Sequence, residues 1–61
     1  MYLNVYIGGN NTLWVESGQG TLTKVEDYTV DNNSIYFYIF NSVYSTNLPM
    51  KEGLSGIAQK M

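Results

Sequence analysis

The sequence predicts a small, mainly β protein of the α+β kind: an antiparallel meander sheet of four to five strands followed by a short C-terminal helix. Three observations predict it. Apolar and polar residues alternate in several short segments, clusters of Gly, Asn and Ser separate these segments, and residues 48–61 change to a helical spacing.

The first two strands are predicted at residues 2–7 and 12–16, where every second side chain is apolar. Residues 8–11 between them read Gly-Gly-Asn-Asn, and these residue types tolerate the positive φ angles that tight turns need. The two segments therefore predict a hairpin.

A third strand is predicted at residues 21–30, after a turn at residues 17–20. Leu22, Tyr28 and Val30 share one parity along this segment and Val25 has the other, so we expect a bulge or bend between Val25 and Asp27. Residues 31–34 then form a turn, and a fourth strand runs from residue 35 to about residue 44. Because each connection is only about four residues long, sequential antiparallel pairing is the economical topology.

The C-terminal segment, residues 48–61, is a candidate helical tail. Its apolar side chains recur at i, i+4, i+7, i+8 and i+11, which places them on one face of a helix: Met50, Leu54, Ile57, Ala58 and Met61. Gly53 and Gly56 each disfavour a helix by roughly 1 kcal/mol relative to alanine, so the helix would depend on docking. The alternative is a short fifth strand at residues 42–46 followed by a disordered tail.

Composition bounds the class of protein. At 61 residues we expect one domain spanning residues 1–61, with a small stability margin. The chain has no cysteine and no histidine, so disulfides and the commonest zinc ligands are excluded, and the cytoplasm is the expected compartment. Three lysines, no arginine and a net charge of −2 argue against nucleic-acid binding. No apolar stretch reaches the roughly 18 residues of a membrane span, so no membrane partner is expected.

Alternation assigns most apolar residues to one face. The expected core residues are Leu3, Val5, Ile7, Leu13, Val15, Leu22, Val30, Ile35, Phe37 and Ile39, with Met50, Leu54 and Ile57 of the tail packed against them. Because residues 35–40 are apolar or aromatic on both sides of the strand, the opposite face also needs cover.

That opposite face collects most of the aromatic side chains, and we interpret it as an interaction surface. Its predicted members are Tyr2, Tyr6, Trp14, Tyr36, Tyr38, Phe40 and Tyr44. Tyrosine and tryptophan combine large rigid contact area with a polar tip and are enriched at interfaces. Packing of these rings within a curled sheet is an equal alternative, and a base-stacking platform is a weaker one because the basic groove is missing.

No residue pattern predicts catalysis. A nucleophilic triad needs a base such as histidine, which is absent, and Glu26 and Asp27 are expected on opposite faces of a strand. The Asp31-Asn32-Asn33 segment lacks the glycine and glutamate of a calcium loop. We therefore expect no enzyme activity, no cofactor and no metal site.

The sequence favours a noncatalytic protein-interaction module. We expect it to be homodimeric and to act as a small inhibitor that binds and blocks a larger host protein, of the kind that phages and other mobile elements encode against defence systems. Two alternatives are a self-assembling structural subunit and a small-ligand binder with an aromatic pocket.

Overall fold

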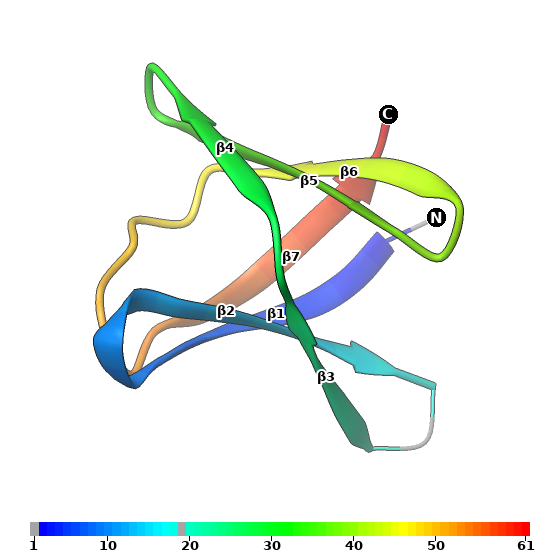
Figure 1. Ribbon diagram of the computed structural model, residues 1–61, viewed down its shortest axis with the longest axis horizontal. Helices are drawn as coiled ribbons and strands as arrows, with labels where there is room; N and C mark the ends of the chain where they lie inside the picture. The colour runs from blue at the N-terminus through cyan, green and yellow to red at the C-terminus, as the bar shows by residue number, and fades with distance from the viewer. Residues whose placement is uncertain (1, 19) are drawn as a thin grey trace.

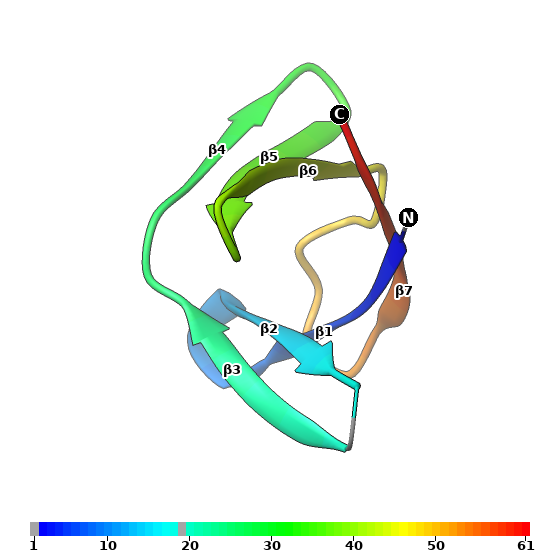
Figure 2. The same cartoon turned by 90° about the vertical axis from the view of Figure 1, so that its right-hand side faces the viewer.

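The computed structural model describes residues 2–18 and 20–61, which form one antiparallel sheet of seven strands that curls on itself (Figures 1 and 2). The strands are β1 (Tyr2–Gly8), β2 (Thr12–Ser17), β3 (Thr21–Val25), β4 (Tyr28–Asp31), β5 (Ser34–Ile39), β6 (Ser42–Thr46) and β7 (Ser55–Lys60). A short 3-10 turn, η1 (Gly9–Asn11), joins β1 to β2. Antiparallel pairing is thus confirmed, but the strand number exceeds the predicted four to five.

The strand order in the sheet is β3-β2-β1-β7-β6-β5-β4. Consecutive strands pair with each other everywhere except at β3 and β4, which form the two opposite edges. The curl brings these edges to the same side of the molecule, where Glu26 and Asp27 link them covalently (Figure 2). The first strand, β1, pairs with the last strand, β7, and this pairing joins the N-terminal and C-terminal halves of the sheet.

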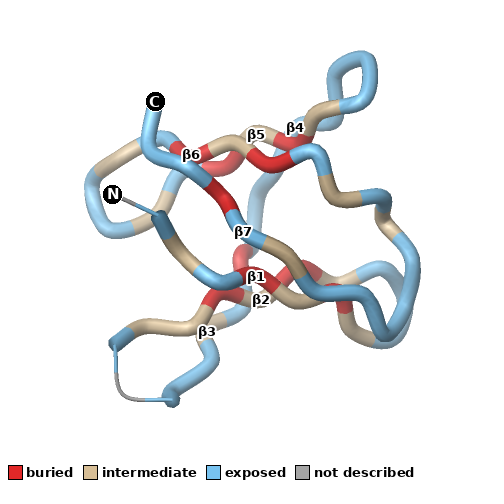
Figure 3. The backbone as a smooth tube through the Cα atoms, turned by 180° about the vertical axis from the view of Figure 1, so that it is seen from behind, coloured by how far each residue is buried: buried red, intermediate tan, exposed pale blue. Residues whose placement is uncertain are grey.

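The concave inner face of the curl holds the hydrophobic core (Figure 3). Its buried members are Val5, Ile7, Leu13, Val15, Val25, Ile35, Phe37, Tyr44 and Ala58, with Leu3, Ile39, Leu48 and Met50 partly buried against them. Alternation predicted six of these nine correctly, from Val5 to Phe37. Because the sheet curls, one chain covers its own apolar face. The need for cover on the opposite, aromatic face stays a prediction.

Leu22 and Val30 were predicted in the core and are exposed instead. Leu22 pairs with Glu16 in the outward-facing register of β2 and β3, while Val25 pairs with Leu13 and takes the inner position. Val30 pairs with Ile35, but it lies in the four-residue edge strand β4, which has no neighbour on its other side.

The predicted third strand, residues 21–30, is two strands. The expected irregularity at Val25 to Asp27 is where the chain leaves one sheet edge and starts the other. The sequence had predicted that Glu26 and Asp27 lie on opposite faces of one strand. They lie instead in the two-residue connection between β3 and β4.

The predicted fourth strand, residues 35–44, is also divided. β5 ends at Ile39, Phe40 and Asn41 form a two-residue turn with φ angles of 52° and 61°, and β6 begins at Ser42. Positive φ at both central residues is the geometry that hairpin turns use. The alternative of a short strand at residues 42–46 is confirmed, but the disordered tail expected after it is wrong, because residues 55–60 form β7.

The predicted C-terminal helix is wrong, because residues 55–60 form β7. This strand lies between β1 and β6 and pairs with both, which satisfies backbone groups that would otherwise be two further open edges. Ala58 is buried in the core, whereas Leu54 and Ile57, expected to pack on it, are exposed. Among the described residues, no helix has the length and apolarity needed to cross a membrane.

Candidate functional site

Four strands present an uncharged aromatic surface on the outer face of the curl. Tyr38 of β5 is paired with Val43 of β6, and the Met61 N–H donates a hydrogen bond to the Val43 carbonyl, so one row crosses three neighbouring segments. The next row runs from Tyr36 through Ser45 and Gln59 to Tyr2. We call Tyr2, Tyr36, Tyr38, Val43 and Met61 the outer tyrosine patch.

Exposure of this patch is unusually high for such side chains. Tyr38 is 64% exposed, Met61 70% and Val43 42%, and Tyr2 is also exposed. Tyr36 is half-buried between its neighbours. Of the seven predicted interface residues, Tyr36 and Tyr38 lie beside Val43 and its neighbour Met61, and Tyr2 lies at the far end of the second row, beyond Ser45 and Gln59.

Tyr6 and Trp14 lie on the opposite wall of the curl, paired with each other across β1 and β2. Both are half-buried and engaged within the chain. The Tyr6 hydroxyl donates to Glu16 Oε1 at 2.7 Å, and the Trp14 indole N–H donates to Thr12 Oγ1 at 2.9 Å. Tyr6 lies four residues along β1 from Tyr2 and pairs with Ser55 of β7, so this pair lies outside the outer tyrosine patch.

The hydrogen bond to Glu16 changes the acidity of Tyr6. The pKa of the Tyr6 hydroxyl is raised above its usual value, mainly because the neutral hydroxyl donates to the Glu16 carboxylate, with smaller contributions from desolvation and from the carboxylate charge. This tyrosine keeps its proton at higher pH than a free one does.

Phe40 and Tyr44 do not belong to the outer surface of the strands. Phe40 is exposed in the turn between β5 and β6, where it lines a hollow of about 490 Å³ together with residues that include Leu3, Tyr44 and Lys60. Tyr44 is only 2% exposed and stacks on Phe37 inside the core. The turn at residues 40–41 reverses the chain and resets the alternation, so Tyr44 as a surface contact is a wrong prediction.

A hollow of about 460 Å³ adjoins the patch on the outer side of β4 and β5. Its lining includes Asp27, Tyr28, Thr29, Tyr36, Tyr38 and Val43. We call it the aromatic hollow. Alternation could identify Tyr36 and Tyr38, but Asp27 and Tyr28 were missed because their position depends on the break between β3 and β4.

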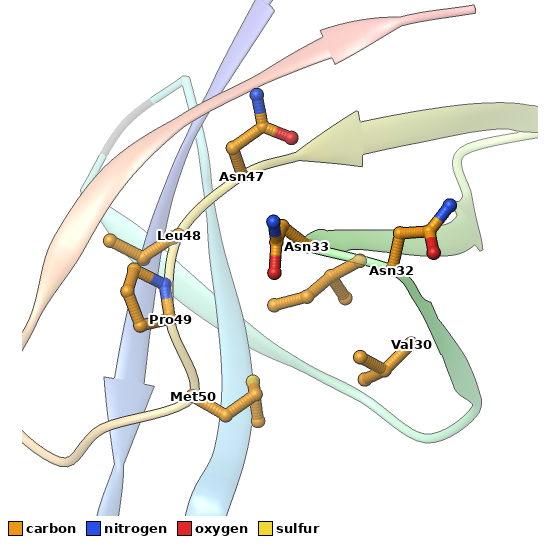
Figure 4. A pocket seen from close by; sticks show the side chains of 8 residues that line it. Val30, Asn32, Asn33, Asn47, Leu48, Pro49 and Met50 are labelled. Atoms are coloured by element: carbon orange, nitrogen blue, oxygen red, sulfur yellow. The ribbon is translucent and has the colours of Figure 1, made fainter.

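A third hollow, of about 420 Å³, opens at the end of the curl between the β4–β5 turn and the segment after β6 (Figure 4). Asn32, Asn33 and Asn47 contribute amides to its lining, and the apolar part comes from Val30, Ile35, Leu48, Pro49 and Met50. The Ser34 hydroxyl donates to Asn47 Oδ1 at 2.8 Å, which fixes that amide. None of the lining residues has an ionisable side chain.

Metal chemistry has no obvious location in the described part of the chain, where no three His, Cys, Asp or Glu side chains gather. The fold and these surfaces define a small all-β protein with a patch of aromatic and apolar side chains on its outer face. No family model matches the chain, and neither the curated proteins nor the solved structures contain a match to it.

Proposed function

We propose that this chain is a noncatalytic protein-interaction module that binds a larger protein through the outer tyrosine patch and thereby blocks it. The observation that supports the proposal is the patch itself, whose aromatic and apolar side chains are all exposed except for the half-buried Tyr36 and carry no charge. Protein interfaces are enriched in tyrosine and methionine and depleted of charged residues at their centre, which is the composition of this patch.

Energetics favour coverage of this surface. Removing apolar surface from water stabilises a complex by roughly 25 cal/mol per Å², and tyrosine loses little side-chain entropy when it is fixed. Exposed apolar patches on soluble monomers are commonly functional. A second copy of the chain could cover the patch in the same way, so a homodimer remains part of the proposal.

A self-assembling structural subunit is the second candidate, and a different feature favours it. β3 and β4 are both sheet edges, and every residue of β4 is exposed. Unpaired backbone groups along such an edge are a template for pairing with another strand. Assembly by this route would extend beyond a dimer, because each copy has two edges.

Solution mass as a function of concentration, together with affinity capture, tests the proposal. Tyr38→Ser removes an exposed patch residue, and Leu22→Ser is the matched control, since Leu22 is exposed on β3 outside the patch. We expect Tyr38→Ser to weaken dimerisation or the capture of one stoichiometric protein at least several-fold, and Leu22→Ser to leave both unchanged.

The outcomes separate the candidates. If Tyr38→Ser and Leu22→Ser behave alike, the patch is not the binding surface. If mass grows beyond a dimer and Val30→Lys in β4 stops that growth, the edge-pairing alternative holds instead, because an edge lysine opposes strand addition.

A further inference from the structure

The aromatic hollow has a lining that favours one class of ligand. Tyr36 and Tyr38 contribute aromatic rings on the outer face of β5, and Asp27 is the one lining residue with a carboxylate. None of the three lysines lines it. Aromatic faces carry negative electrostatic potential, so rings and carboxylate act in the same direction and attract a cation.

Spacing along β5 suits a cation between two rings. Tyr36 and Tyr38 are two residues apart on the outer face, and a strand advances about 3.3 Å per residue, so their origins are roughly 6.6 Å apart. A group midway between them is within the approximately 6 Å at which a cation interacts with a ring centroid. One cation could therefore contact both faces.

The edge strand beside the hollow is held in place before any ligand binds. The Tyr28 hydroxyl donates a hydrogen bond to the Asn11 carbonyl at 3.1 Å, which ties β4 to the turn between β1 and β2. Because the chain itself holds this strand, less conformational entropy is lost when a ligand binds beside Asp27 and Thr29.

The negative charge around the aromatic hollow favours a cationic ligand. Glu26 precedes Asp27 in the same link, and the chain carries a net charge of −2. A phosphate or carboxylate would be repelled here, whereas a guanidinium or ammonium group gains from the carboxylate and the rings together. The hollow is also continuous with the outer tyrosine patch through Tyr36, Tyr38 and Val43.

We propose that the aromatic hollow binds a basic side chain, arginine or lysine, presented by the protein that covers the outer tyrosine patch. This inference rests on the proposed function and specifies the chemistry of the partner: an apolar surface with a basic residue at the position that meets Asp27.

The test uses small probes on the intact chain. N-acetylarginine amide is titrated while the tyrosine ring signals are followed by NMR, and N-acetylcitrulline amide serves as its neutral isostere. N-acetyllysine amide, with a free ε-ammonium, is the second cationic probe. We expect the cationic probes to shift the Tyr36 and Tyr38 signals with about three- to five-fold higher affinity than the citrulline probe, from the size of cation–π interactions at exposed sites.

Two variants with the same change in net charge show which carboxylate contributes to binding of the arginine probe. Asp27→Asn removes the carboxylate of the hollow, and Asp31→Asn removes one at the end of β4 that does not line it. We expect Asp27→Asn to lower the affinity for the arginine probe about three-fold, and Asp31→Asn to leave it within error. Tyr38→Leu, which keeps apolar area but removes the ring, should abolish the preference for the cationic probe.

Equal affinities for the arginine and citrulline probes, or equal effects of Asp27→Asn and Asp31→Asn, would overturn the cation site. These measurements need no partner, so they are independent of the proposed function. A chain that binds the arginine probe while Tyr38→Ser leaves its mass and its capture of a partner unchanged would overturn the proposed function alone.

Discussion

Phe37 and Tyr44 stack on each other across the β5–β6 hairpin, with ring centroids 5.9 Å apart and an angle of 16° between their planes. Both side chains are buried in the core. Offset stacked rings contribute about 0.5–1.5 kcal/mol beyond the area they bury. In a 61-residue chain without disulfides, this pair joins the two strands of the hairpin inside the core.

The first prediction concerns this pair. Tyr44→Ala should lower the free energy of unfolding by about 3–5 kcal/mol, because it leaves a cavity against Phe37 in the centre of the core. For a domain this small, that loss unfolds most of the population at 25 °C, which urea titration followed by circular dichroism would detect.

Tyr38→Ala is the matched control for that substitution. Tyr38 lies on the same hairpin but on its outer face, so its loss should change the free energy of unfolding by no more than about 0.5 kcal/mol. Equal losses from the two variants would contradict the assignment of Tyr44 to the core and Tyr38 to the surface.

Sequence patterns predicted the N-terminal half of the fold well. Alternation in residues 2–7 and 12–16, with the asparagine-rich turn between them, defines β1 and β2 and the burial of Val5, Ile7, Leu13 and Val15. In this hairpin the local signals and the global fold agree, so local reasoning was sufficient.

Other elements depend on partners distant in the sequence. β7 contains Gly56 and Ala58, which have little strand preference, and it is a strand because β1 and β6 both need a neighbour. The β5–β6 turn was missed because phenylalanine is rare at positive φ, and Phe40 has a φ of 52°.

Only part of the candidate site was predictable from the sequence. Tyr36 and Tyr38 follow from the alternation of β5, but their juxtaposition with Asp27 depends on where β4 begins, and the separation of Tyr6 and Trp14 from them depends on strand order and register. Neither is encoded in local spacing.

The second prediction concerns the close approach of Trp14 to Gly8. A Cβ at position 8 would lie 2.7 Å from Thr12 Oγ1 and 2.9 Å from Trp14 Nε1. Gly8→Ala should therefore displace the indole and break its hydrogen bond to Thr12, at a cost of about 1–3 kcal/mol in unfolding free energy. A shift in the fluorescence of Trp14, the one tryptophan of the chain, reports the displacement directly.

Gly18→Ala provides the comparison, because an added Cβ there meets no atom within 4 Å. It should leave both the fluorescence spectrum and the stability nearly unchanged. Identical spectra for wild type and Gly8→Ala would show that the indole does not lie against Gly8.

The third prediction concerns the junction of β6 and β7. The Thr46 hydroxyl donates to the Ile57 carbonyl at 3.0 Å and accepts the Leu48 N–H at 3.4 Å, and Thr46 is buried. Thr46→Val keeps the shape but removes both bonds, so it should cost about 1–3 kcal/mol.

Hydrogen exchange of the β7 amides checks this directly, because they should exchange faster in Thr46→Val than in wild type. Thr29→Val, in the exposed edge strand β4, should change neither stability nor exchange in β7. If Thr46→Val leaves β7 as protected as before, the hydroxyl does not secure the strand.

The fourth prediction concerns the pH dependence of stability. The pKa of the Tyr6 hydroxyl in the folded chain is raised, first by its hydrogen bond to Glu16, so it exceeds the unfolded value of about 10. A raised folded pKa means that the contribution of Tyr6 to stability is complete below about pH 10 and is lost as the pH rises further, through the folded pKa. The free energy of unfolding of Tyr6→Phe should therefore differ most from that of wild type in the neutral range, and the difference should shrink above pH 10.

Unfolding free energies from pH 7 to 11 measure this difference, and the contributions of the other tyrosines cancel because both proteins contain them. In a Glu16→Gln background the same substitution should show a weaker pH dependence, since the carboxylate is the main cause of the shift. A difference between wild type and Tyr6→Phe that stays constant over the whole range would contradict the coupling of these two side chains.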